Sequence, residues 1–518
     1  MGLFQIESRA QIQMLRRTRP RDLADLAVEV AIVRPGPIVG GAVNPYVRRR
    51  EEQRRAREAG RPYEPPVDHP LLRDVLAETL GVILYQDQVL QVCQALAGFT
   101  AGQAEALRRA MSRRRSRELM AGFWEEFRSG AAARGVTERV AEKVFTQVIA
   151  FSEFGFPKSH AAAFGLLAYQ SAWLRHYHPA EYYTGLFNNQ PMGFYSLDAL
   201  GRDAKRNGIE IRLPDVNVSD VWCTVADEGK GRLKAGEGGR GAGVVRVGLA
   251  FIRDWSEETA TAVVAEREQG GPFRSVGDVV RRAPPQLKRP AIEHLVWVGG
   301  CDGFGLTRRE LVWQVGLWLP PTAHPGDDAR RRRQLELPLN HPFEHLRFGG
   351  LEAGERVLAE YAVLGFAASG HPLQLLRGAL PPGVVSSDRL PGLQHGSGVE
   401  VAGLVVARQR PETAKGFIFV LLEDEAGMVN VIVRPDVYQR YRPAIRGEPL
   451  LWVRGKLAKD DGTVNLLAEE VRGLHCGMRI ADCGIEGPPV ESAIRNPQSE
   501  IAFLRSMRRV APESKDWG

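Results

Sequence analysis

The sequence predicts a multidomain α+β protein that is mainly helical in its N-terminal part and ends in a small β-barrel. Residues 1–185 carry apolar side chains at helical spacing, whereas residues 399–471 alternate apolar and polar side chains in five short runs. The length of 518 residues also exceeds what one core supports, since a domain usually takes about 100–200 residues. We therefore expect several separately packed domains.

Composition and charge narrow the class of protein. With 44% hydrophobic and 25% charged residues, the chain is globular in composition, and no run reaches the ~18 consecutive apolar residues of a membrane span. No signal peptide pattern opens the sequence, so a cytoplasmic location is expected. The five scattered cysteines form no C-x-x-C pair, and we expect this chain to bind no cofactor or metal ion. The net charge of +7 favours a polyanionic partner.

Residues 151–177 join a turn that carries polar groups to a long apolar helix. Because Pro157 opposes helix formation before it, the helix is expected to begin near Ser159, whose hydroxyl can cap the first turn. The apolar run that follows predicts that this helix is mostly buried. Lys158 and His160 would then lie at a helix N-terminus, which favours anions such as phosphate. The alternative is a capped core helix with solvated flanks.

Two further segments of the helical part carry arginines suited to phosphate. Residues 101–116 form a predicted helix in which Arg108 and Arg109 point about 100° apart, and their planar guanidinium groups can meet phosphate oxygens. Arg34 is held at a turn that two prolines and a glycine impose on residues 34–37. A solvated basic helix end is the equally supported alternative for the first of these segments.

The character of the sequence changes after residue 185. Residues 186–320 contain turn formers, a short helix and a predicted helix-hairpin-helix that opens at Gly248. Such hairpins offer backbone N–H groups to DNA phosphates without reading the bases, and plain two-helix packing is the alternative. Residues 321–384 are a predicted linker with a short apolar peptide that can dock on a partner protein. Its candidate docking residues are Gln334, Leu335 and Leu337.

Residues 385–475 contain five predicted strands with a helical patch after the third, the pattern of a five-stranded OB barrel. Barrels of this kind bind single strands with aromatic rings and cations. The candidate DNA-binding residues are Arg408, Arg410, Lys415, Phe417, Phe419 and Arg434. Core packing is the alternative for the two phenylalanines, because alternation buries one face of a strand. The tail, residues 476–518, is expected to be only partly ordered, although residues 501–504 can dock.

Five strings in order resemble a known family, the bacterial DNA polymerase III alpha subunit, a C-family polymerase. They are FQIESRAQ (4–11), RPGPI (34–38), GVILYQDQVLQV (81–92), LRRAMS (107–112) and FGFPKSHAAAF (154–164). Two later strings are similar to the error-prone, damage-induced branch of that family, namely NNQPMGFYS (188–196) and LPDVNVS (213–219). The resemblance covers essentially the whole chain.

The resemblance implies that residues 1–185 are a polymerase fingers region and that the chain takes part in template-directed nucleotidyl transfer, past DNA damage and in repair. It implies five residues at the triphosphate of the incoming deoxynucleotide: Arg108, Arg109 and Lys158 facing it, with Arg34 and His160 nearby. The implied partners are primer-template and single-stranded DNA, deoxynucleoside triphosphates, a sliding clamp and other translesion-synthesis proteins.

The family's catalytic palm motif, P-D-x-D-x-D, and its histidine-rich PHP domain are not found in these 518 residues. Two-metal nucleotidyl transfer needs clustered carboxylates, so the chain alone is expected to be inactive, and Mg²⁺ is implied only for the complete polymerase. The competing interpretation is a non-enzymatic module that binds DNA and docks on partners.

Overall fold

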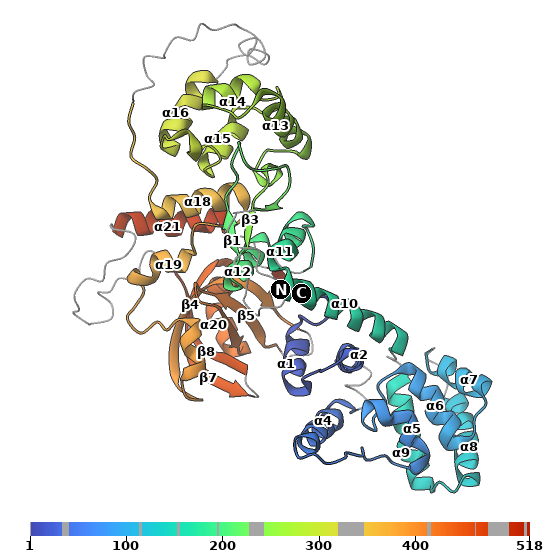
Figure 1. Ribbon diagram of the computed structural model, residues 1–518. Coiled ribbons are helices and arrows are strands. Elements are labelled where there is room, and N and C mark those ends of the chain that lie inside the picture. Colours follow the sequence, from blue (N-terminus) through green and yellow to red (C-terminus); the bar gives the residue numbers. More distant parts are fainter. Residues whose placement is uncertain are drawn as a thin grey trace. The chain divides into compact units, whose positions relative to one another are not determined.

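The structure, a computed structural model, divides into two compact units, Met1–Tyr177 and His178–Gly518, which are described separately (Figure 1). The predicted site residues Arg34, Gln334, Leu335, Leu337 and Lys415 lie outside the described residues. No helix in the described part of the chain is long and apolar enough to cross a membrane. The described residues are 2–33, 41–112, 117–152, 156–193, 196–226, 243–319, 346–411, 416–460, 463–474, 497–511 and 515–517.

The regular secondary structure of the first unit's described residues is helical. Side-chain caps begin its first two helices: Ser8 accepts the N–H of Gln11, and Asp22 accepts that of Asp25. The helices are α1 (Arg9–Thr18), α2 (Leu23–Ile32), α4 (Val43–Glu58), α5 (Arg73–Leu76), α6 (Gln86–Ala97), α7 (Ala101–Ser112), α8 (Arg117–Ala133), α9 (Glu138–Ser152) and α10 (Lys158–Tyr177), with the 3-10 turns η1 (Pro70–Leu72) and η2 (Ala77–Thr79).

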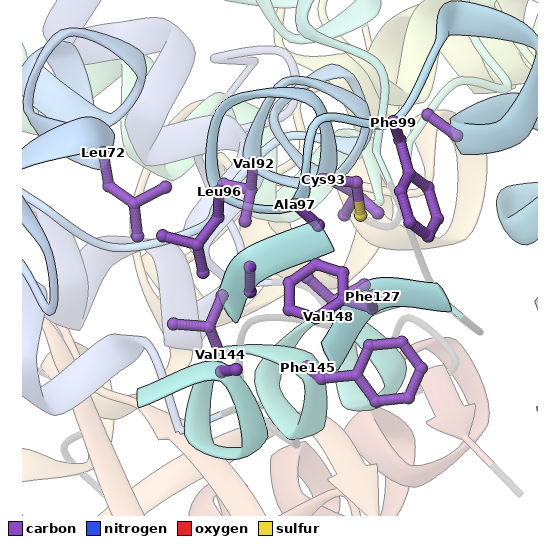
Figure 2. Packing of buried hydrophobic residues seen from close by; sticks show 14 of the residues in the cluster. Leu72, Val92, Cys93, Leu96, Ala97, Phe99, Phe127, Val144, Phe145 and Val148 are labelled. Atoms are coloured by element: carbon purple, nitrogen blue, oxygen red, sulfur yellow. The ribbon is translucent and has the colours of Figure 1, made fainter. Parts of the chain in front are cut away.

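Helices α6 to α9 enclose one hydrophobic core, part of which is drawn in Figure 2. The rings of Phe127 and Phe145 lie 5.2 Å apart at its centre, and Phe127 and Leu96 are fully buried. Burying such a side chain contributes roughly 1.5–3 kcal/mol. A Cβ on Gly130 would lie 2.0 Å from the carbonyl oxygen of Ala97, so the close approach of α8 to α6 requires glycine there. This core holds α6 and α7, which carry part of the candidate site.

Helix α10 is far less buried than its apolar sequence predicts. Its small side chains form the packed face, where a Cβ on Gly165 would lie only 3.1 Å from the backbone nitrogen of Ala27 on α2. The buried residues along α10 are Ala161, Gly165 and Ala168, whereas Leu166, Leu167, Trp173 and Leu174 are 42–45% exposed. The prediction of a mostly buried helix is therefore wrong for this chain, because an apolar run does not show which face packs.

The second unit combines helices with two sheets. Its small sheet has three strands in the order β1-β3-β2, with β1 (Glu210–Arg212), β2 (Thr224–Val225) and β3 (Val244–Arg246). Its α-helices are α11 (Pro179–Asn188), α12 (Leu197–Arg206), α13 (Glu257–Gly270), α14 (Val276–Arg282), α15 (Arg289–Trp297), α16 (Arg308–Trp318), α18 (Ala353–Leu364), α19 (Pro372–Leu376), α20 (Pro435–Gly447) and α21 (Pro497–Val510), and its 3-10 turns are η3 (Leu249–Phe251), η4 (Asp302–Phe304), η5 (Arg377–Ala379) and η6 (Ser387–Gly392).

The larger sheet is the predicted five-stranded barrel, drawn in orange in Figure 1. Its order is β5-β6-β8-β7-β4, and pairing of β4 with β5 closes it. Alternate side chains of β5 and β6 point inward, and α20 lies between β6 and β7 in sequence as predicted. The strands are β4 (Gly398–Gln409), β5 (Ile418–Glu423), β6 (Met428–Val433), β7 (Leu450–Asp460) and β8 (Thr463–Gly473). The fold class, a multidomain α+β protein with an OB-type barrel, is therefore confirmed.

The C-terminal segment contributes more structure than the sequence indicates. A further strand, β9 (Lys515–Trp517), pairs in parallel with β4 at residues 407–409. Phe503 and Met507 of α21 are buried in a hydrophobic cluster with Trp452 of β7. Three residues are too few for an alternating pattern, which is why β9 escapes prediction from sequence.

A buried ionic network connects α12, α18 and β5. Arg202 lies 2.5 Å from Asp198 Oδ2 and 2.7 Å from Glu423 Oε2, and the Tyr361 hydroxyl donates to Asp198 Oδ1 at 3.0 Å. Arg206 makes a second ion pair with Glu423. Burial raises the pKa of both carboxyl groups, and the guanidinium of Arg202 opposes that rise. The network thus holds the barrel against the helices of the same unit.

Candidate functional site

The N-terminus of α10 lies against the start of α6. The backbone N–H of Gln86 donates to the carbonyl of Phe156 at 3.0 Å, and the backbone N–H of Lys158 donates to Asp87 Oδ2 at 2.8 Å. The helix begins at Lys158, so Ser159 lies within the first turn and not before it, where the sequence predicts it. A carboxylate from α6 therefore already accepts a hydrogen bond at the start of α10.

The side chain of Lys158 is also paired. Its Nζ lies 2.7 Å from Glu78 Oε2, and the two side chains are 52% and 44% exposed. Gln88, which is buried, donates from Nε2 to Thr79 Oγ1 at 2.9 Å and so fixes the turn that carries Glu78. An open cleft of about 720 Å³ adjoins this pair and is lined by Asp74, Val75, Ala77, Glu78, Gln91, Gln94, Ala95 and Lys158.

Arg108 and Arg109 on α7 share one carboxylate. Glu105 accepts from Nε and Nη2 of Arg108 at 2.7 and 2.6 Å, and from Nε of Arg109 at 2.9 Å. The hydrogen bonds from Arg108 and then Arg109 lower the pKa of Glu105 to about 2, so this carboxylate stays ionised at neutral pH. The side chains of Arg108 and Arg109 are 29% and 75% exposed.

Asp87 links the two groups of cations. It binds the start of α10 directly, and it also acts electrostatically on the guanidinium of Arg108, whose pKa Glu105 raises most and Asp87 raises further. Lys158 and Arg108, which are 50 positions apart in the sequence, therefore both interact with Asp87, the first through a backbone hydrogen bond and the second through electrostatic attraction. We call this cluster of Lys158, Arg108, Arg109, Glu78, Asp87 and Glu105 the cation cluster.

His160 is exposed and makes edge-to-face ring contacts. The ring centroids of Phe156 and Phe164 lie 4.9 and 4.1 Å from that of His160. These contacts fix the imidazole on the first turn of α10, two residues after Lys158.

The sequence patterns select the three cations of the cluster but not its three carboxylates. A local signal exists for Glu105, because it lies three and four positions before the two arginines of a predicted helix, where ion pairs form. Asp87 and Glu78 are 71 and 80 positions from Lys158, and no local pattern signals contacts of that range.

Gly248, the residue at which the predicted hairpin opens, is required by packing. A Cβ there would lie 2.4 Å from the carbonyl carbon of Trp222 and 2.5 Å from the carbonyl oxygen of Val221. Ser256 caps α13 as predicted, since its side chain accepts the N–H of Thr259. The first turn of α13 is acidic, with Glu257 and Glu258.

The start of α15 has the opposite charge. Lys288 is its N-cap residue, Arg289 opens the helix, and the first turn contains no acidic residue. Beyond α15, Gly299 adopts a left-handed φ of +87°, and the buried Arg308 donates to both oxygens of Asp302 at 3.0 and 2.9 Å. The basic turn from α14 to α15 therefore suits DNA phosphates better than the acidic start of α13 does.

The barrel candidates fall into two groups. Arg408 donates to the carbonyls of Ile445 and Glu448 at 2.5 and 2.7 Å, and so fastens β4 to the end of α20. Arg410 lies over the ring of Tyr438 at 5.6 Å, and the exposed Arg434 pairs with Asp436 at 3.3 Å. Phe417 and Phe419 are half-buried and lie outside the barrel core. Strand β5 contributes residues such as Ile418 and Val420 to that core.

Three family models match the chain in order. The model described as "Bacterial DNA polymerase III alpha subunit finger domain" matches residues 1–135, a helix-hairpin-helix motif matches residues 208–311, and an OB-fold nucleic acid binding domain matches residues 399–474. The order of the three regions agrees with the order predicted from the sequence.

The chain is also similar to proteins described as error-prone DNA polymerases. It is 41% identical to that of Anaeromyxobacter sp. (strain K) over 92% of this chain and 40% of the relative. Identity is 38% to that of Corynebacterium efficiens, over 92% of this chain and 41% of the relative, and 38% to that of Mycobacterium tuberculosis H37Rv, over 91% and 40%. The chain thus spans about two fifths of the length of these curated relatives.

Among solved structures, asparaginyl-tRNA synthetase from Pyrococcus horikoshii matches 22% of this chain and 26% of its own at 20% identity, with a TM-score of 0.16, too low to support a conclusion. The sequence comparisons and the three ordered regions agree with one another. The chain therefore belongs to the bacterial DNA polymerase III alpha family, in its error-prone branch.

Proposed function

We propose that the first unit binds the triphosphate of an incoming deoxynucleotide and that the second unit binds DNA. Together they would serve template-directed nucleotidyl transfer past damage and in repair. The observation that carries this proposal is that Asp87 accepts the backbone N–H of Lys158 at the start of α10 and also attracts Arg108, which shares Glu105 with Arg109. Guanidinium groups bind phosphate through paired N–H donors, and a helix N-terminus favours the same charge. Cations held there would stabilise the negative charge that develops on the leaving pyrophosphate.

The metal ions of the complete reaction are not assigned to this chain. Among the described residues, no three His, Cys, Asp or Glu side chains gather closely enough to hold a metal ion. Mg²⁺ is therefore proposed only for the complete polymerase, and the roles proposed for the cations and the barrel residues do not depend on it. Because the family's P-D-x-D-x-D motif is not found in these 518 residues, we propose that this chain binds the nucleotide and does not extend a primer alone.

The second unit offers two surfaces for DNA. We propose that the basic turn from α14 to α15 receives the phosphate backbone, since backbone N–H groups and cations bind phosphate without reading bases. Single-stranded bases would stack on Phe417 and Phe419 beside Arg410, where each stacked base contributes about 1–3 kcal/mol. Gln334, Leu335 and Leu337, beyond the described residues, remain the proposed docking peptide for a sliding clamp.

The proposal predicts a loss of nucleotide binding when a cluster cation is removed. In Arg108→Ala or Lys158→Ala, dATP affinity should fall by roughly 10- to 100-fold, because a hydrogen bond to a charged group is worth about 1.5–3 kcal/mol. The measurement is calorimetric titration of the full chain with dATP at low salt. Arg128→Ala is the matched control, because Arg128 makes an exposed pair with Glu125 in the same helical spacing, at 2.7 Å. Equal affinities in Arg108→Ala and Arg128→Ala would refute the triphosphate role.

A further inference from the structure

The cation cluster is already electrically neutral without a ligand. Glu78 pairs with the side chain of Lys158, and Asp87 accepts its backbone N–H. Glu105 serves both arginines. Three cations thus face three carboxylates, so a phosphate ligand would meet no net positive charge when it arrives.

Glu105 occupies the part of each arginine that a phosphate would use. It takes the Nε–Nη2 edge of Arg108 with both carboxylate oxygens and the Nε of Arg109 with one of them. A phosphate oxygen pair binds guanidinium through the same kind of edge, so carboxylate and phosphate compete there. Glu78 likewise holds the Nζ of Lys158.

We propose that Glu105 and Glu78 are resident anions that a polyphosphate must displace, and that they set the affinity of the site for phosphate ligands. The proposal rests on the function proposed above and adds these two residues to it. The Lys158–Glu78 pair is exposed and the Arg108–Glu105 pair is partly buried, and the carboxylate side chains are 44% and 32% accessible, so either carboxylate can turn into water once phosphate takes its place. Water-accessible ion pairs of this kind exchange readily because each is worth only about a 1.4-fold to fivefold change in an equilibrium constant.

Displacing Glu105 costs every phosphate ligand that binds Arg108 the same factor in affinity, so the ratio of two affinities is unchanged while the weaker ligand falls below half-occupancy first. Orthophosphate can contact one or two cations, whereas a triphosphate of charge about −4 reaches more of them, since each phosphate oxygen is a strong acceptor. A common penalty leaves the triphosphate bound and drives single phosphates off at the same concentration. When the ligand leaves, the carboxylates return to the cations and the site is neutral again.

Glu105→Gln is the decisive variant, because it keeps the size of the side chain and removes its charge. Sodium tripolyphosphate and orthophosphate, titrated into the full chain at fixed ionic strength without magnesium, should each bind Glu105→Gln about two- to tenfold more tightly than wild type. The gain should be constant between pH 6 and pH 9, since the pKa of Glu105 is held at about 2. Glu125→Gln is the matched control and should change neither affinity.

Two further variants separate the possible outcomes. Glu78→Gln frees Lys158 through a different carboxylate and should tighten binding by a smaller factor, since one pair is released instead of two. If Arg108→Ala weakens tripolyphosphate binding but Glu105→Gln and Glu78→Gln do not tighten it, the resident-anion proposal is wrong and the triphosphate role stands. If Arg108→Ala leaves tripolyphosphate binding unchanged, the triphosphate role itself is wrong.

Discussion

Each unit contains a cluster of arginines and carboxylates, and the two clusters differ mainly in burial. In the first, Arg108 and Arg109 share Glu105, and in the second, Arg202 pairs with both Asp198 and Glu423. In the first unit, the side chains of Arg108 and Glu105 are 29% and 32% exposed. In the second, those of Arg202 and Glu423 are 9% and 0% exposed. We expect the two arginine–carboxylate clusters to serve different purposes. Water screens an accessible ion pair and can solvate either member, but it cannot reach a buried pair.

The comparison shows why charge type alone does not identify a binding site. A buried ion pair cannot lose one member without leaving an uncompensated charge in a medium of low polarity. An exposed pair can exchange its carboxylate for a phosphate at little cost. We therefore expect the buried network of Arg202 to be structural and propose the cation cluster as the site that a ligand can enter.

Breaking the buried network should produce the largest effect. In Arg202→Met, Asp198 and Glu423 keep their burial but lose their cation, so the free energy of unfolding should fall by about 3–5 kcal/mol. Chemical denaturation followed by circular dichroism measures the loss. Arg454→Met removes an arginine that is 55% exposed and paired with Glu470, and it should change stability by less than about 1 kcal/mol. Similar losses in the two variants would contradict the distinction.

A buried carboxylate whose hydrogen-bond partner is neutral should change the free energy of unfolding by a smaller amount, which depends on pH. Glu29 of α2 is 1% exposed, and the Thr18 hydroxyl donates to its Oε2 at 2.6 Å. Burial raises the pKa of Glu29 from 4.5 to about 7, although this hydrogen bond opposes the rise. Between these values the unfolded chain releases the proton and the folded chain keeps it, so stability falls as pH rises, by about 3 kcal/mol in total.

Glu29→Gln tests that assignment, because the amide oxygen can still accept from Thr18 and carries no titrating proton. Urea denaturation at pH 5, 6, 7 and 8 should show the decline in wild type and a flatter profile in the variant, which becomes the more stable protein at pH 8. Parallel profiles for the two proteins would mean that Glu29 does not titrate in this range.

How far the sequence predicts this molecule depends on the range of the interactions involved. The barrel follows from alternation, because strands such as β6 bury every second side chain. The sequence places helix α10 correctly but not its exposure, since small residues such as Gly165 and Ala168 form its packed face. Local helix patterns select Lys158 and Arg108, whereas the hydrogen bond of Asp87 to Lys158 and its attraction for Arg108 depend on tertiary packing. The domain boundaries stay predictions.

The smallest expected change in stability gives the most direct test, because Arg108 should act on the ligand and not on the fold. Thermal unfolding of Arg108→Ala without ligand should match wild type to within about 1 kcal/mol, because the partly buried Arg108 and its partner Glu105 both still reach water. Sodium tripolyphosphate should raise the melting temperature of wild type, because it binds the folded state, and should raise that of Arg108→Ala much less. A melting temperature that falls in Arg108→Ala as far as in Arg202→Met, with the ligand-induced rise intact, would show instead that the exposed cluster is structural.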